Sequence, residues 1–195
     1  MSLKRCFIFV AFLQKEVKMN QVKKTVLAGL LLAIGMVLPF VTGQIPQIGS
    51  MLLPMHIPVL LCGFLCGGPW GLAVGFIAPL FRSFLTGGFP PFFPTAVCMA
   101  FELAAYGAAA GFLHRMLTCK KAYIYITLVA AMIIGRVVWG IAMLVCMGIN
   151  GGAFTLGAFL AGAFTNAIPG IILQIVAIPI LVMALERTNL FRQND

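Results

Sequence analysis

Charged side chains are scarce in this chain: they make up 9% of its 195 residues, and only four of them are Asp or Glu. Apolar residues make up 62%. A soluble domain has about 25% charged and about 45–50% apolar residues, and at this length much of so apolar a chain would stay exposed to water. The composition argues against a cytosolic enzyme, a nucleic-acid-binding module and a disordered segment. It predicts a protein that lies in a lipid bilayer.

The sequence also lacks the short motifs of ATP hydrolysis and of catalysis. It has no glycine-rich phosphate loop, so the chain does not bind and hydrolyse ATP by itself, and it has neither a serine nucleophile motif nor a His-Glu-x-x-His zinc motif. Cys62 and Cys66 are spaced for one helix face, but no His or carboxylate lies beside them to complete a metal site. Packing as small apolar residues is the expected role of such cysteines. We therefore expect no enzyme activity, no metal and no cofactor.

Six apolar segments follow the N-terminal region, and each is expected to form a membrane helix. They cover residues 25–41, 55–66, 70–85, 94–116, 122–147 and 156–185. The second segment is short and could be re-entrant, which would leave five spans; six are favoured because both chain ends then lie on one side. The sequence thus predicts an all-α, integral membrane six-helix bundle over residues 19–190, with a cytoplasmic tail at 191–195.

The first 18 residues are expected to be an N-terminal extension outside this fold. Their apolar run, residues 6–13, is too short to span a bilayer, for which about 20 residues are needed. Met19 opens a positively charged flank for the next segment, so we hypothesise that translation starts there; a short interfacial helix over residues 1–18 is the alternative. N-terminal sequencing of the native protein tests this, and a mature terminus at Met1 or Ser2 would contradict it.

The net charge of +9 falls on alternate sides of the apolar segments. Positive residues precede the first segment (Lys15, Lys18, Lys23 and Lys24), separate the fourth and fifth (His114 if protonated, Arg115, Lys120 and Lys121) and follow the sixth (Arg187 and Arg192). The intervening connections, residues 42–54, 86–93 and 148–155, contain no Lys or Arg. Because Lys and Arg favour cytoplasmic loops, both termini are expected in the cytoplasm of a bacterial cell. The charge indicates topology rather than nucleic-acid binding.

Polar side chains inside the spans are candidate site residues, since an ion at the bilayer centre costs a few kcal/mol. The candidates are His56, Arg82, Glu102, Arg136 and Asn166. At 1.5 Å per residue, Glu102, Arg136 and Asn166 lie roughly 12–16 Å from the outer ends of their segments. Arg82 and His56 are expected nearer the outer mouth, and Gln174 falls in the inner half. The pattern predicts an outward-facing pocket that captures a solute. The alternatives are a structural Glu102–Arg136 pair, an Arg82 that snorkels to the interface and a His56 that caps its helix.

Aromatic residues gather at the same mouth. Phe92 and Phe93 belong to the stiff loop 89–94, which either closes over a bound ligand as a lid or forms part of an interfacial aromatic belt. Tyr106 and Trp139 lie one helical turn from Glu102 and Arg136, where they line the pocket or pack within the bundle.

Small residues recur at every fourth position in three segments. The series are Gly67, Gly71 and Gly75 in the third, Gly29 and Ala33 in the first, and Ala158 and Gly162 in the sixth. Such faces let helices approach closely, within a chain or between chains.

Four stretches of the chain share one resemblance. They are the run Leu53-Pro-Met-His-Ile-Pro-Val-Leu-Leu-Cys-Gly with its continuation to Gly75, Pro79-Leu-Phe-Arg-Ser, Phe93-Pro-Thr-Ala and Phe101-Glu-Leu-Ala-Ala-Tyr-Gly. Together they resemble the substrate-binding S component of an energy-coupling factor (ECF) vitamin transporter. The resemblance covers roughly residues 23–187. It implies a six-helix S-component fold with a vitamin bound near the outer face. It also implies two kinds of partner, a membrane coupling subunit and two cytosolic ATPases, and it implies that Gly29 and Ala33 contact the coupling subunit.

The substrate is expected to be a small organic molecule, with a carboxylate such as pantothenate favoured slightly. Within the spans two Arg face one Glu, which leaves one net positive charge and disfavours cationic thiamine; pyridoxine, a pyrimidine precursor and riboflavin remain open. The resemblance also disfavours nickel and cobalt, because the members of that family that bind these metals carry a Met-x-His start and neither Met1 nor Met19 opens that way. We expect Arg82 or Arg136 to meet the anion, Glu102 to orient Arg136, and Asn166 to read a polar group. A self-sufficient secondary transporter or channel is the main alternative, and an intramembrane enzyme or a purely structural subunit are weaker ones.

Overall fold

The computed structural model describes residues 21–41, 53–88, 90–117, 122–149, 155–163 and 167–187, and this part of the chain contains helices and no strand. Its elements are α2 (Gln21–Val41), α4 (His56–Cys66), α5 (Gly68–Leu85), the π-helical turn η1 (Phe92–Ala96), α6 (Val97–Met116), α7 (Ala122–Ile149), α8 (Leu156–Ala163) and α9 (Ile168–Arg187). The predicted all-α class is confirmed.

The sixth predicted segment is not one helix. It forms α8 and α9, so the expectation of a continuous helix over residues 156–185 is wrong and the count of six helices is not confirmed. Pro169 and Gly170 lie in the first turn of α9, where proline is tolerated because its missing N–H has no partner in the helix. Both residues are uncharged, so the apolar pattern runs through the break. Among the residues that the structure describes, four helical stretches are long and apolar enough to cross a membrane, at Gln21–Phe40, Phe92–Met116, Tyr123–Ile149 and Ile168–Leu185.

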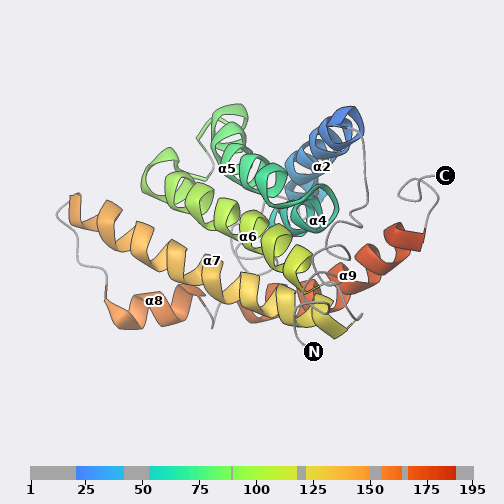
Figure 1. The fold of residues 1–195 in the computed structure, drawn as a ribbon. Coiled ribbons are helices and arrows are strands. Elements are labelled where there is room, and N and C mark those ends of the chain that lie inside the picture. The colour runs from blue at the N-terminus through green and yellow to red at the C-terminus, as the bar shows by residue number, and fades with distance from the viewer. Residues whose placement is uncertain are drawn as a thin grey trace.

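Helix α6 is the centre of the bundle (Figure 1). It packs against α4, α5 and α7, while α2 lies on α4 and α5, and α9 contacts α4 and α7. α8 packs along the part of α7 that carries Trp139, and the two helices lie side by side at one side of the molecule in Figure 1. Helices α4, α6, α7 and α9 therefore share one interior, which holds the polar residues described below.

Glycines allow α4, α5 and α6 to pack with their backbones in contact. A Cβ atom added at Gly71 would lie 2.5 Å from the carbonyl oxygen of Gly107, and one added at Gly107 or Gly63 would meet the backbone of the neighbouring helix. Gly75 is packed in the same way against Leu103 of α6. The predicted small-residue face of the third segment thus serves contacts within the chain.

Basic residues from α2 and α6 gather at one end of the bundle. A Cβ atom added at Gly67, between α4 and α5, would lie 3.0 Å from Nη2 of Arg115, and the ring of His114 packs edge-to-face on Phe64. The Sγ atom of Cys66 lies 3.8 Å from the carbonyl oxygen of Lys24. We call this the basic end, defined by Lys23, Lys24, His114 and Arg115. Lys24 and Arg115, which the charge pattern assigned to the same side, lie at the same end of the bundle.

Candidate functional site

A buried carboxylate, Glu102 on α6, joins three helices. Nη1 of Arg136 on α7 donates a hydrogen bond to Oε1 of Glu102 at 2.7 Å, and Nε2 of His56 on α4 lies 3.5 Å from the same oxygen. Glu102, Arg136 and His56 are 2%, 5% and 1% exposed, respectively. The Glu102–Arg136 pair is therefore buried, unlike surface ion pairs, which contribute little to stability. We call these three residues the polar cluster.

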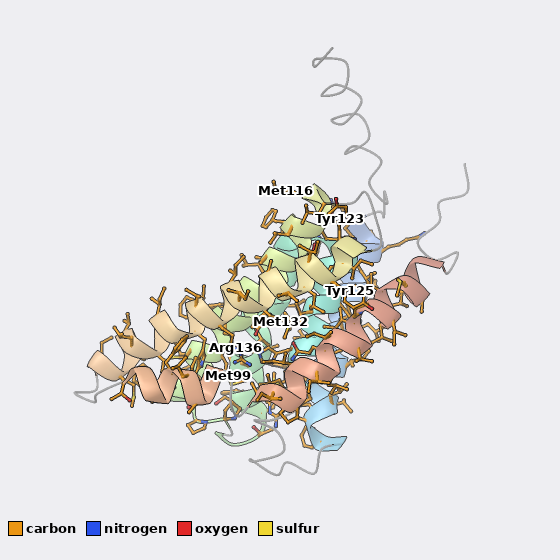
Figure 2. All side chains as sticks on the ribbon, turned by 90° about the horizontal axis from the view of Figure 1, so that it is seen from below. Met99, Met116, Tyr123, Tyr125, Met132 and Arg136 are labelled. Atoms are coloured by element: carbon orange, nitrogen blue, oxygen red, sulfur yellow. The ribbon has the colours of Figure 1, made fainter. Side chains whose placement is uncertain are left out.

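Local packing explains why the cluster forms. On α6 a spacing of three to four residues places Glu102 and Tyr106 on one face, and α7 lies along that face. A Cβ atom at Gly135 would overlap the ring of Tyr106, so glycine there lets the ring fill the space between α6 and α7. The Tyr106 ring in turn packs edge-to-face on the His56 ring, with centroids 5.0 Å apart. Figure 2 shows Arg136 level with Met99 of α6, away from Met116 and Tyr123 at the opposite end of these helices.

Several buried polar atoms of the cluster have no hydrogen-bond partner among the described residues. They are Nε and Nη2 of Arg136, Nδ1 of His56 and the hydroxyl of Tyr106. A buried polar group without a partner costs about 1–3 kcal/mol, so such atoms mark a place that water or a ligand completes. The two free nitrogens of Arg136 lie on one edge of its planar guanidinium, while Nη1 is used by Glu102. This edge presents two parallel N–H donors, the arrangement that pairs with the two oxygens of a carboxylate.

Arg82 does not snorkel to the surface. It lies in the last turn of α5 and is 6% exposed, and its Nε atom has no hydrogen-bond partner among the described residues. Its carbonyl oxygen accepts hydrogen bonds from the backbone and the side chain of Thr86, which closes the helix end. No ion pair within the described ranges links Arg82 to the polar cluster, so it is a second buried cation towards the end of the bundle opposite the basic end.

The described part of the aromatic loop is held in place, and the rings of Phe92 and Phe93 are exposed. The Ser83 hydroxyl donates to the carbonyl oxygen of Pro90 at 2.7 Å, and η1 packs against α5, α6 and α7. Phe92 and Phe93 are 58% and 42% exposed, so neither ring is buried against the polar cluster in this structure.

Trp139 faces α8 rather than the polar cluster. Its ring stacks on Phe159 of α8 with centroids 6.1 Å apart, and a Cβ atom at Gly162 would lie 2.7 Å from the Trp139 ring. Asn166, the polar reader expected from the sixth segment, lies outside the described residues.

Two buried polar residues without a hydrogen-bond partner among the described residues were not among the predicted site residues. Gln174 of α9 and Thr127 of α7 are both fully buried, and neither the amide atoms of Gln174 nor the hydroxyl oxygen of Thr127 has a partner in the part of the chain that the structure describes. The sequence signal for Gln174 is simple, since it is the one polar side chain in a long apolar run.

The family of the chain follows from comparison with known proteins. A family model described as "ECF transporter, substrate-specific component" matches residues 23–182. The chain belongs to this family. No curated protein and no solved structure matches it. ECF substrate-specific components are transporter subunits that bind a small substrate and pair with a module made of a membrane subunit and ATPases. The matched range of this ECF component contains the whole polar cluster together with Arg82 and Gln174.

Proposed function

We propose that this chain is the subunit that captures a small organic anion, with a pantothenate-like carboxylate favoured, and hands it to an ECF module. The observation that carries the proposal is the free edge of Arg136, two parallel donors that are buried and unused beside Glu102. A bidentate pair between a guanidinium and a carboxylate satisfies both donors at once.

The charges of the buried residues favour an anion. Glu102 balances Arg136, whereas Arg82 has no acidic partner within the described ranges. An uncompensated buried cation is costly, and an anionic ligand reduces that cost. A cationic vitamin such as thiamine would add to the positive charge instead.

The carboxylate requirement can be tested on the unmodified protein with a matched ligand pair. Panthenol has an alcohol in place of the carboxylate of pantothenate and keeps the rest of the molecule. Because hydrogen bonds to charged groups contribute about 1.5–3 kcal/mol, we expect panthenol to bind roughly 10- to 100-fold more weakly than pantothenate in isothermal titration calorimetry. Equal affinities would contradict a carboxylate site at Arg136.

The exposed face of α2 supports the docking of the coupling subunit there. A Cβ atom added at Gly29 would meet no atom within 4 Å, and the side chain of Ala33 is exposed. Only 28% of the membrane-spanning stretch Gln21–Phe40 is buried inside the protein. This face is therefore open to a second helix, in contrast to the glycine face of α5.

A bulky residue on this face tests the docking surface. We expect Ala33→Trp to reduce co-purification of the coupling subunit at least tenfold, because close helix approach requires small residues, and to leave substrate affinity unchanged. Ala158→Trp, at an exposed position on α8, is the matched control and should affect neither. Normal assembly of the Ala33→Trp variant would rule out this face.

We also infer that the basic end faces the cytoplasm and that the polar cluster is reached from the other side. The support is the absence of Lys and Arg from alternate connections in the sequence and the gathering of Lys24 and Arg115 at one end of the bundle. Positive loops are retained on the cytoplasmic side during insertion. A cysteine introduced beside Arg115 should react with a membrane-impermeant thiol reagent only after the cells are opened.

A further inference from the structure

Gln174 is buried at a position where its amide group makes no hydrogen bond to the described residues. It is 0% exposed, and neither its Nε2 nor its Oε1 atom has a partner within the described residues. An apolar residue of similar size would fill the same volume without leaving a donor and an acceptor unpaired. Its burial is explained if a bound molecule supplies the missing partners.

The direction of Gln174 follows from the helix on which it lies. On α9 the fully buried residues Gln174, Ile178 and Val182 share one face at a spacing of four. α9 contacts α4 and α7, so this face is turned towards the two helices that carry His56 and Arg136.

Gln174 lies six residues, or about 9 Å, along α9 from its first residue, Ile168. Arg136 lies at the middle of α7. Figures 1 and 2 both place the beginning of α9 against the middle of α7. Gln174 is therefore displaced from the level of Arg136 by about 9 Å along α9, a separation that a small extended molecule bound at Arg136 can span.

We propose that Gln174 completes the substrate site and that the substrate is a small carboxylate carrying a neutral amide. The free edge of Arg136 takes the carboxylate, the Nε2 atom of Gln174 donates to the amide carbonyl oxygen, and its Oε1 atom accepts from the amide N–H or from an adjacent hydroxyl. The inference rests on the proposed anion-binding function and adds a second point of recognition on a different helix. A simple fatty acid or a short hydroxy acid would not satisfy this second point.

The test measures pantothenate binding by isothermal titration calorimetry for the wild-type chain, Gln174→Leu and Thr127→Val. Thr127 is the matched control, because its hydroxyl is equally buried and unpaired but lies closer to the basic end, about 7 Å from the start of α7. We expect at least a tenfold loss of affinity in Gln174→Leu and no change in Thr127→Val. Unchanged affinity in Gln174→Leu would mean that the amide meets only water, and it would overturn the proposal while leaving the anion site intact.

A ligand-side measurement keeps the proposal testable if Gln174→Leu does not fold. In a pantothenate analogue with two methylene groups in place of the amide, the wild-type chain should lose at least tenfold in affinity, and a folded Gln174→Leu variant should lose nothing further. If the wild-type chain binds the analogue as well as pantothenate, Gln174 does not read an amide. If it binds neither compound nor any other carboxylate vitamin, the proposed function itself is wrong, and this inference falls with it.

Discussion

Glu102→Met is expected to destabilise the chain by about 3–5 kcal/mol, the cost of leaving one member of a buried ion pair without its partner. In this variant Arg136 stays buried but loses Glu102, the residue that accepts its hydrogen bond in the structure. Thermal unfolding in a mild detergent should therefore show a large fall in melting temperature, and pantothenate binding should be lost.

The double variant Glu102→Met, Arg136→Met separates a structural role from a ligand-binding role. Replacing both members of a buried pair by apolar residues is often neutral or stabilising, so the double variant should recover most of the stability of the wild type. It should still bind no pantothenate, because the donors for the carboxylate are gone. Wild-type affinity in a stable double variant would show that the pair only holds α6 to α7.

Gly107→Val is expected to have the largest purely structural effect. Its Cβ atom would overlap the carbonyl group of Gly71, and because the atoms that must move are backbone rather than a flexible side chain, α5 and α6 must separate. Overpacking of a core costs about 1–3 kcal/mol and sometimes more, and we expect the upper part of this range or failure to fold. The measurement is the melting temperature of the purified chain.

Gly29→Val is the matched control for Gly107→Val. Both substitutions place valine at a helical glycine, so their effects on helix propensity are similar, but a Cβ atom at Gly29 meets nothing within 4 Å. We expect its melting temperature to remain within a few degrees of the wild type. Equal destabilisation by both variants would show that helix propensity, and not the contact between α5 and α6, is the cause.

Much of the fold follows from the sequence because membrane helices are set by composition over long windows. The apolar segments, the close-packing glycines at Gly71 and Gly75 and the common end of Lys24 and Arg115 are all visible in the pattern. The division of the sixth segment into α8 and α9 is not visible in the sequence, because the residues on both sides of it are apolar. Hydropathy alone does not distinguish one long helix from two consecutive helices.

The candidate site was predictable in depth but not in direction. Helical rise places Glu102 and Arg136 at one level, and the structure joins them in an ion pair. A spacing of three residues, however, leaves Trp139 rotated about 60° from Arg136 around the helix axis, and its ring meets α8 instead. Gln174 was assigned to the inner half of the membrane and was not included in the candidate site.

The most direct test of the account is native mass spectrometry of the purified chain, extracted in mild detergent and incubated with an equimolar panel of pantothenate, panthenol, thiamine, pyridoxine and riboflavin. The account predicts a one-to-one complex with pantothenate that outcompetes panthenol and disappears in the stable Glu102→Met, Arg136→Met double variant. Preferential binding of thiamine, or a pantothenate complex of equal abundance in the double variant, would contradict the assignment of Arg136 as the residue that binds the substrate anion.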